Sequence, residues 1–583
     1  MIGSVRFDSA TFDEPNHIAR GFGYLHGECG LSPQHPPLFE LLSAFTAESM
    51  LHPRLPSPST YLQDVAQGDA RALGDSLLFT AGNDADQMLF WSRVPAMVLS
   101  TVVGAMIYLV GLEAFDPSTA LIATLLYAFS PTVLAHSRYA TTDIAAVFGF
   151  LVGIVSYMAF LERPSRIRTL LAGLALGVAL LTKFSTSLLF IVYPILLAEW
   201  LIATVHGDLR QCVRGAAPLI ARSVALGAIA GVVVWGIYGC LMINCPVDEQ
   251  AVRTRLWLSD ADCPAALAWL ITEVSSTSFI RPLGQYLLGI AIAHGHVANG
   301  PAYPVYFMGM MARGGSYGYF PILYSLKEPL PVHLLTVIGV SATLLSARRA
   351  FAHMHEGFAE WMRGHFVEIG LASFVVTYWL VAVSSNLNLG IRHLLPTFPA
   401  IYLLVVRRLV AWIERDRPQT ALGLDGRVLA GFLAMGPRGM LVAGLLAWLI
   451  SESFLIYPHY LSYYNEVAGG SWNGHWYAAE SNYDWGQDYR GLQWFVRGEG
   501  IERIAVDGFE SASLRYYLGG AYIPWRSALG PPHGWFAISI TRRDKAWARA
   551  PGGRLRDRGS YAWLRGVAPV GRIGYCIWLY KFP

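Results

Sequence analysis

Long apolar segments alternate with short polar connectors over the first 457 residues. A membrane-spanning helix needs about 20 mostly apolar residues. Segments of this kind predict ten spans, near residues 93–112, 118–135, 144–161, 168–182, 185–203, 219–243, 331–347, 367–384, 394–412 and 429–457. The stretch 168–203 is too long for one span, so it predicts two short helices that meet near Lys183. The pattern indicates a polytopic α-helical membrane protein.

The connectors between these spans differ in charge. Four of them carry arginines: Arg163, Arg166 and Arg168; Arg210, Arg214 and Arg222; Arg348, Arg349 and Arg363; Arg407, Arg408, Arg415, Arg417 and Arg427. Short loops rich in Arg and Lys stay in the cytoplasm. Both termini and the long external loop 244–330 are therefore predicted to face outward. We expect an integral protein of the plasma (inner) membrane whose outer face is periplasmic if the host has an outer membrane.

The two ends of the chain predict different structures. Residues 1–88 would be the first external loop of a membrane module covering 1–457, yet no apolar segment or signal peptide precedes them. We therefore expect that a first span is missing from this sequence. Residues 458–583 are richer in Gly, Arg and Trp and predict a small extracytoplasmic α/β domain. Its β-like runs are Arg503–Val506, Trp535–Ile540 and Tyr575–Tyr580.

Composition agrees with a membrane protein and excludes one class of partner. Hydrophobic residues make up 54% of the chain and charged residues 14%, against roughly 25% charged residues in soluble domains. The net charge is only +3, and no basic run is interleaved with aromatic residues. These features predict membrane lipid as a partner and no nucleic acid.

Cysteine and histidine spacing gives little support for a cofactor. Cys240, Cys245 and Cys263 lie close together, so two of them would pair if their loop faces an oxidising compartment, or all would be free buried thiols. His294 and His296 are two residues apart with no evident third ligand. A divalent metal is therefore possible but unsupported, and no cofactor is predicted with any specificity.

Ionisable residues collect on the predicted outer side of the spans. They are Asp13 and Glu14 in DEPNH, Arg138 and Asp143 in SRYATTD, Lys183 in TKFS, Lys327 and Glu328 in LKEPLP, and Arg392 and His393 in GIRHLLP. Charged groups at membrane depth are costly and usually mark function. Carboxylates beside cations suit two tasks, which are deprotonating a hydroxyl and holding a phosphate.

Each of these residues also has a structural interpretation. Arg138 and Arg392 would serve equally as anchors whose side chains reach the membrane interface. Asp13 would cap a helix that begins before Pro15. Lys183 would be a surface lysine at the tip of a helical hairpin.

Several longer strings resemble one family. They are DEPNH followed by SPQHPPL, TTD at 141–143, TKFS at 182–185, YFPILYSLKEPLP at 319–331, NLGIRHLLPTFP at 388–399, YYNEVAGG at 463–470 and SNYDWGQD at 481–488. In this order they resemble the lipid-carrier-dependent glycosyltransferases of the GT-C class, which include protein O-mannosyltransferases and the aminoarabinose transferase. SNYDWGQD is similar to the DSNLDWGQDL signature of a bacterial branch. Glu328 departs from the pattern, because the family has a small polar residue there.

The resemblance implies an enzyme. It would be a glycosyltransferase that moves a hexosyl or pentosyl group from a polyprenyl-phosphate donor to an acceptor hydroxyl on the extracytoplasmic face, usually with inversion. In this family the acidic pair follows the first transmembrane helix, which agrees with the missing span. The sugar stays open, and so does the acceptor, which would be a protein, a lipid or a glycan.

The resemblance also implies roles for single residues. Asp13 would be the catalytic base, Glu14 would orient Asp13 or the acceptor, and Asp143 would help to place the sugar or the acceptor. The donor phosphate would be bound by Arg392, with Arg138, Lys183, His393 and Lys327 as further candidates. Sugar or acceptor contacts are expected from Asp484, Trp485, Gln487 and Asp488. The alternative is that this last motif only caps a helix beginning near Tyr489 and docks the C-terminal domain.

Two other functions remain open. A transporter or flippase of lipid-linked sugars would also need a groove for the lipid and cations for its phosphate. It needs neither an external acid pair nor a soluble domain. A non-enzymatic membrane assembly protein would use 458–583 as its interaction module, but this leaves the clustering of acids and bases unexplained.

Overall fold

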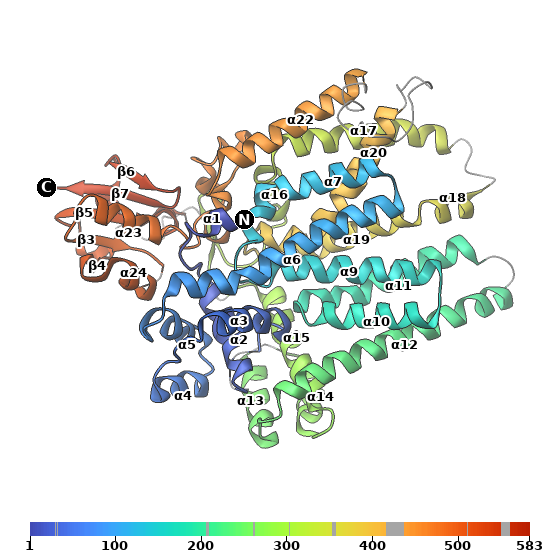
Figure 1. The fold of residues 1–583 in the computed structure, drawn as a ribbon, viewed down its shortest axis with the longest axis horizontal. Coiled ribbons are helices and arrows are strands. Elements are labelled where there is room, and N and C mark those ends of the chain that lie inside the picture. The colour runs from blue at the N-terminus through green and yellow to red at the C-terminus, as the bar shows by residue number, and fades with distance from the viewer. Residues whose placement is uncertain are drawn as a thin grey trace.

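The computed structural model describes residues 1–28, 31, 33–205, 209–260, 263–301, 303–351, 357–414, 436–509, 511–549 and 560–583. Long helices lie side by side along the longest axis, and a small sheet lies beyond one end of them (Figure 1). We call that end of the helical bundle the sheet end. The helices of the bundle are α6 (Ala85–Ala114), α7 (Pro117–Phe129), α9 (Asp143–Glu162), α10 (Arg166–Leu180), α11 (Leu189–Thr204), α12 (Leu209–Leu241), α17 (Leu330–Phe351), α19 (Phe366–Ser384), α20 (Phe398–Glu414) and α22 (Gly436–Leu455).

Seven helical segments of the described chain are long and apolar enough to cross a membrane. They are Ala85–Ala114, Asp143–Glu162, Phe184–Thr204, Val213–Leu241, Phe366–Ser384, Ile391–Glu414 and Gly436–Leu455. An eighth crossing is formed if α16 (Tyr319–Lys327) and α17 act as one span, although they are bent by 109°. The protein is therefore a multi-pass integral membrane protein, as predicted. The first part of the predicted span 429–457 lies outside the described residues.

Two predicted spans have a different form in the structure. The segment 118–135 is broken at Ser130, where Pro131 follows, into α7 and the short helix α8 (Pro131–His136). Ser130 caps α8 by accepting a hydrogen bond from the Val133 N–H, and Pro131 cannot continue the preceding ladder. The segment 168–182 forms α10, which has 15 residues. The predicted break near Lys183 is present, because Lys183 lies between α10 and a 3₁₀ turn at Phe184–Leu188.

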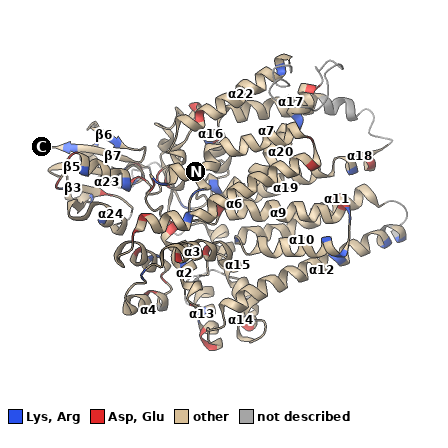
Figure 2. Ribbon diagram, viewed as in Figure 1, with Lys and Arg blue, Asp and Glu red and all other residues tan. Residues whose placement is uncertain are grey.

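Charged residues lie near the two ends of the bundle, and long uncharged stretches separate them (Figure 2). This distribution suits a slab of hydrocarbon about 30 Å thick. The connectors predicted to face outward come together at the sheet end, where α8 and the 3₁₀ turn Ile391–Thr397 contact short turns between residues 460 and 482.

Further helices and one hairpin cover the sheet end. They are α1 (Ile2–Val5), α2 (Glu14–Leu25), α3 (Pro37–Leu51), α4 (Pro58–Ala66), α5 (Ala70–Asp75), α13 (Val247–Asp260), α14 (Ala265–Ser276) and α15 (Arg281–Asn299), with the hairpin β1 (Val305–Phe307) and β2 (Met310–Ala312). At the other end of the bundle lies α18 (Phe358–Gly364).

Cys245 is disulfide-bonded, but Cys240 and Cys263 are free thiols, so the predicted pairing among these three is wrong. The alternative of buried thiols also fails for Cys240, which is exposed.

The C-terminal region carries a five-stranded mixed sheet. Its elements are α23 (Tyr489–Gly498), β3 (Ile504–Asp507), α24 (Ser511–Leu518), β4 (Tyr522–Pro524), β5 (Gly534–Ser539), α25 (Ile540–Trp547), β6 (Gly571–Ile573) and β7 (Ile577–Phe582). The strand order is β4-β3-β5-β7-β6, with β3 parallel to β4 and β5 and the other pairs antiparallel. Phe536 and Tyr580 are paired in the register of β5 and β7 and lie in a core on one face. Each of the three predicted β-like runs overlaps a strand (β3, β5 and β7), with ends shifted by one or two residues.

Candidate active site

Four charged side chains from four separate segments meet at the sheet end. The Arg392 Nη1 atom lies 2.9 Å from Asp13 Oδ2 and 3.5 Å from Asp143 Oδ2. The Lys183 Nζ atom lies 2.6 Å from Asp143 Oδ1. We call these four residues the open cluster. Two carboxylates and two cations thus share one location, although up to 379 positions separate them in the chain.

Local structure places each member of the open cluster. Asp13 precedes the first residue of α2, and Asp143 is the first residue of α9, where its Oδ2 accepts a hydrogen bond from the Thr141 hydroxyl. Arg392 lies in the 3₁₀ turn Ile391–Thr397, which packs against α9. Gly390 before this turn has φ = +144°, and a Cβ there would lie 2.5 Å from Ser481 Oγ. Glycine is therefore required for this backbone approach.

The members differ in accessibility. The exposed fraction of the side chain is 27% for Asp13, 14% for Lys183, 11% for Arg392 and 1% for Asp143. The Arg392 guanidinium also stacks on the Trp485 indole, 4.4 Å from the ring centroid. Asp13 is thus the carboxylate that a molecule from outside reaches first, and Asp143 lies behind the cations.

Glu14 does not face the open cluster. Its Oε1 and Oε2 atoms are each 2.7 Å from Arg93, and they also accept hydrogen bonds from the backbone N–H groups of Thr11 and Ala140. Burial alone would raise the pKa of Glu14, but Arg93 and these hydrogen bonds outweigh it and lower the pKa. We call the Glu14–Arg93 pair the brace. The side chain has no free oxygen for an acceptor, so of the two roles implied for Glu14 contact with the acceptor is wrong, and orientation of Asp13 stays a prediction.

Arg93 also holds the backbone that leads to Asp13, through contacts that do not involve Glu14. Arg93 donates to the carbonyl oxygens of Val5, Asp8 and Ser9. It thereby fixes the segment that leads into α2 against α6, so the neighbouring Asp13 side chain is held toward Arg392.

Two predicted phosphate ligands are engaged elsewhere. Arg138 is fully buried, and its Nη2 atom lies 2.9 Å from Asp8 Oδ2. Lys327 is buried as well, and its ammonium donates to the carbonyl oxygens of Leu461 and Asn482. Neither cation lies in the open cluster. The Arg138 Nε and Nη1 atoms have no hydrogen-bond partner among the described residues. The interface-anchor interpretation of Arg138 is wrong because its guanidinium is enclosed.

The motif at 484–488 is mainly a docking element. Asp484 accepts hydrogen bonds from the Ser539 hydroxyl and the Thr541 N–H, Gln487 donates to the Tyr483 carbonyl, and Asp488 accepts from the Cys576 N–H. The N–H groups of Ser9 and Phe12 donate to the carbonyl oxygens of Gln487 and Trp485. The helix α23 begins at Tyr489, as the alternative interpretation predicted. Only the Trp485 side chain contacts the open cluster.

Glu328 is also structural. It is fully buried and accepts hydrogen bonds from Ser130 Oγ, at 3.1 Å, and from the Tyr402 hydroxyl, at 2.9 Å. The carboxylate therefore ties the start of α8 to α20 and has no contact with the open cluster.

Two histidines lie next to the open cluster, although the sequence predicted no role for either of them. The His35 Nδ1 atom lies 3.5 Å from Thr142 Oγ1, and the His35 ring lies 4.8 Å from that of His17. Burial, followed by the nearby His17, Arg20 and Lys183, holds the pKa of His35 well below its usual range. His35 is part of QHPPL, whose resemblance to the family was its only signal.

His136 is the second missed histidine. Its side chain is 1% exposed, and neither ring nitrogen has a hydrogen-bond partner among the described residues. The same holds for Arg392 Nε and His393 Nε2, both of which are buried atoms. The sequence offered one signal for His136, which is the polar residue that directly follows the apolar segment 118–135.

Within the described residues, no group of three or more His, Cys, Asp or Glu side chains is arranged to hold a metal ion. His294 and His296 both lie on α15.

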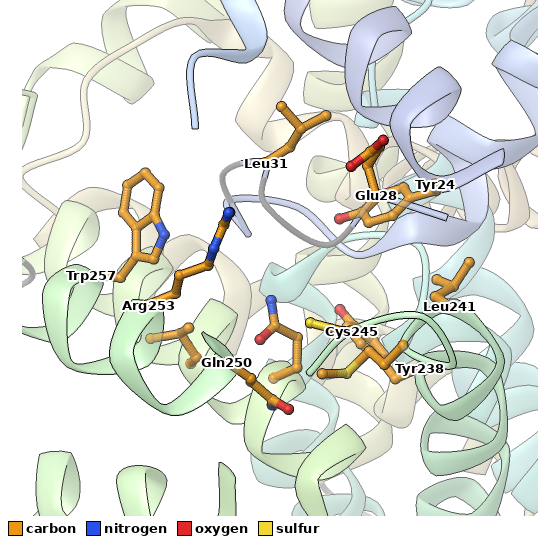
Figure 3. A pocket seen from close by; sticks show the side chains of 12 residues that line it. Tyr24, Glu28, Leu31, Tyr238, Leu241, Cys245, Gln250, Arg253 and Trp257 are labelled. Carbon is orange, nitrogen blue, oxygen red and sulfur yellow. The ribbon is translucent and has the colours of Figure 1, made fainter. Parts of the chain in front are cut away.

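A separate cavity lies between α2, α12, α13 and α15 (Figure 3). Its lining includes Tyr24, Glu28, Tyr238, Gln250, Arg253 and Trp257. No member of the open cluster lines this cavity.

Comparison with known proteins gives one family match. Residues 83–238 match the family model described as dolichyl-phosphate-mannose-protein mannosyltransferase. This segment runs from α6 into α12 and contains Asp143 and Lys183. The match confirms the predicted relation to lipid-carrier-dependent glycosyltransferases of the GT-C class. No curated protein matches the chain.

Two solved structures are similar over most of the chain. One is ArnT from Cupriavidus metallidurans bound to undecaprenyl phosphate, at 12% identity and a TM-score of 0.42, covering 99% of this chain and 95% of that one. The other is the oligosaccharyltransferase of Archaeoglobus fulgidus in the apo form, at 14% identity and a TM-score of 0.42, covering 93% of this chain and 68% of that one.

Proposed function

We propose that this protein transfers a sugar from a polyprenyl-phosphate donor to an acceptor hydroxyl at the open cluster. The observation that carries the proposal is the meeting of Asp13, Asp143, Lys183 and Arg392 at one end of a membrane-embedded helical bundle. The family match over 83–238 supports the chemistry of lipid-phosphate-linked sugar transfer. The description of that family names dolichyl-phosphate-mannose, so a sugar carried on a polyprenyl phosphate is the class of donor that we assign to this chain.

The sheet end would face the extracytoplasmic side. The Arg-rich connectors of the sequence alternate with those that form the open cluster, so the open cluster lies on the side that the positive-inside rule leaves outside the cell. The plasma (inner) membrane is the proposed location. The lipid tail of the donor would lie along the bundle, with its phosphate at the level of Arg392.

Asp13 would act as the base. In the proposed step its carboxylate takes the proton of the acceptor hydroxyl, and the acceptor oxygen forms a bond to the anomeric carbon. The bond between that carbon and the phosphate oxygen breaks, and the electron pair leaves with the carrier phosphate. Attack on the face opposite the phosphate inverts the anomeric carbon. A base of this kind contributes roughly 10²–10⁴ in rate.

Arg392 and Lys183 would stabilise the departing phosphate. A guanidinium offers two parallel N–H donors to phosphate oxygens, and its stacking on Trp485 fixes the plane of the fork. In the structure Arg392 bridges Asp13 and Asp143. A bound phosphate would compete for the same guanidinium and release Asp13 for proton transfer. Asp143, paired with Lys183, would hold that ammonium in place.

The first test is sugar release from a panel of radiolabelled polyprenyl-phosphate sugars by the purified full-length protein. We expect turnover of one donor and a loss of at least 10²-fold in Asp13→Asn, with donor binding retained. The matched control is Asp75→Asn, because Asp75 has a similar exposed fraction of 28% and a similar ion pair, with Arg71. Binding of the donors without turnover, unaffected by Asp13→Asn, would favour the transporter instead.

A further inference from the structure

His136 is a buried polar residue without a structural partner. It ends α8, its side chain is 1% exposed, and both ring nitrogens lack a hydrogen-bond partner among the described residues. The large majority of buried side-chain polar atoms in proteins are hydrogen-bonded, and exceptions require an explanation. A ligand that supplies the missing partners is one such explanation.

The position of His136 favours this explanation. Its ring lies edge-on to Trp485, with the centroids 6.3 Å apart, and Arg392 stacks on the same indole at 4.4 Å. The charges that act on His136 are those of Asp143, Arg392, Lys327 and Lys183. Three of these four belong to the open cluster, and the indole that His136 and Arg392 share places His136 beside the proposed donor site.

The charge state of the ring limits what it would bind. α8 lies outside the helices long enough to cross a membrane, and burial lowers the pKa of His136 to about 3. The imidazole is therefore neutral near pH 7, with one N–H donor and one acceptor nitrogen. Oxygens of an ionised phosphate diester only accept hydrogen bonds, whereas a sugar hydroxyl both donates and accepts.

We propose that His136 binds hydroxyl groups of the donor's sugar, beside the phosphate that Arg392 and Lys183 hold. The inference rests on the proposed function and divides the donor between two sets of residues. The cations recognise the phosphate, which every carrier lipid has, and His136 recognises the sugar, which distinguishes a loaded carrier from a spent one. His136 is thus assigned as a specificity-determining residue.

The test compares two kinds of lipid. One is a short-chain polyprenyl phosphate, and the other is the same lipid carrying mannose, glucose, galactose or aminoarabinose. Affinity is measured for the wild-type protein and for His136→Leu, His136→Asn and Arg392→Ala. His333→Leu is the matched control, because His333 is a partly buried histidine on α17 whose Nε2 also lacks a partner among the described residues.

We expect at least one sugar to raise the affinity of the wild-type protein above that for the bare lipid. His136→Leu should lower the affinity for the sugar-carrying lipid about tenfold. Its affinity for the bare lipid should stay within twofold of the wild-type value. His136→Asn, which keeps a donor and an acceptor, should restore part of the loss. Arg392→Ala should weaken both lipids, and His333→Leu neither. The melting temperature of His136→Leu should be unchanged or higher, since an apolar side chain suits an unpaired buried site.

Three results would overturn the inference. If His136→Leu loses affinity equally for both lipids, His136 contributes to phosphate binding or to folding. If His136→Leu loses no affinity, His136 is only a core residue. If no sugar raises the affinity of the wild-type protein above that for the bare lipid, the protein does not recognise the sugar and His136 has no such role. Failure of the wild-type protein to bind even the bare lipid would overturn the proposed function itself, and this outcome is distinct from the other three.

Discussion

The open cluster and the brace are both built from carboxylates and cations and lie next to each other, yet they differ in exposure and in hydrogen bonding. In the brace, Glu14 is fully buried and both carboxylate oxygens are bonded to Arg93. In the open cluster, Asp13 is 27% exposed and shares a single guanidinium nitrogen with Asp143. The atoms Arg392 Nε and His393 Nε2 have no partner among the described residues.

The difference separates stability from function. A buried ion pair with all its hydrogen bonds made has no capacity left for a ligand, but removing one partner leaves an uncompensated charge. A partly exposed cluster with unpaired donors contributes less to folding and keeps capacity for a substrate. Substitutions in the brace should therefore change the folded fraction, and substitutions in the open cluster should change turnover.

The largest effect is expected from Arg93→Met. This change leaves Glu14 buried without its cation, and it should lower the free energy of unfolding by about 3–5 kcal/mol. The measurement is thermal and chemical unfolding in detergent micelles. The double variant Arg93→Met with Glu14→Gln is the control and should be less destabilised than the single variant, since no unpaired charge remains. A double variant as unstable as the sum of its parts would show that the two side chains do not act as a pair.

Arg392→Lys should affect turnover and leave stability nearly unchanged. Lysine keeps the charge but loses the planar fork and the stack on Trp485. We expect roughly a 10²-fold loss of kcat/KM, a magnitude that removal of one transition-state donor typically produces, with a melting temperature close to that of the wild type. Arg407→Lys is the matched control, because Arg407 is a partly exposed, ion-paired arginine on α20 paired with Glu368 and Asp116. Equal losses in both variants would refute a specific role of Arg392.

The sequence predicted the membrane spans well because hydropathy is a local property. Residues 144–161, 185–203 and 367–384 agree with helices in the structure to within about one residue at each end. The break near Lys183 was also predictable, since the apolar run was too long for one helix. The break at Ser130–Pro131 had a local signal too, a capping serine before a proline, but the hydropathy of the whole segment concealed it.

The roles of charged residues were predictable only in part. Sequence shows that Arg138, Lys327 and Glu14 are charged, but not what neutralises them. Their partners lie far away in the chain: Arg138 pairs with Asp8, Lys327 with backbone oxygens beyond residue 460, and Glu14 with Arg93. Such distant contacts decide between a structural ion pair and an available one, and a single sequence contains no record of them.

Asp484 provides a test of pH dependence beside the open cluster. Burial raises the pKa of Asp484 from its ordinary value of 3.8 to about 6, against the opposing hydrogen bonds of Ser539 and Thr541. The folded state therefore binds more protons than the unfolded state in this interval, so stability falls as the pH rises from about 4 to about 6. Asp484→Asn should remove this decrease, which is on the order of 1–3 kcal/mol. Melting temperatures between pH 4 and pH 8 test it, and parallel curves for both proteins would contradict it.

The smallest effect is expected from Trp485→Phe. The indole that stacks on Arg392 is replaced by a smaller ring with a weaker quadrupole, which should cost about 0.5–1 kcal/mol of donor binding. Affinity for the donor should therefore fall a few-fold, while kcat stays close to the wild-type value. Titration of the donor under single-turnover conditions separates the two constants. A loss confined to kcat would place Trp485 in the chemical step instead.

The most direct test of the account compares Asp13→Asn with Glu14→Gln, two adjacent residues assigned to different tasks. The melting temperature and the turnover per folded molecule are measured for both variants. We predict that Asp13→Asn melts like the wild type and loses at least 10²-fold in turnover, whereas Glu14→Gln melts at a clearly lower temperature and keeps most of its turnover per folded molecule. A stable Glu14→Gln variant without turnover, or an Asp13→Asn variant with full turnover, would contradict the division between the brace and the open cluster.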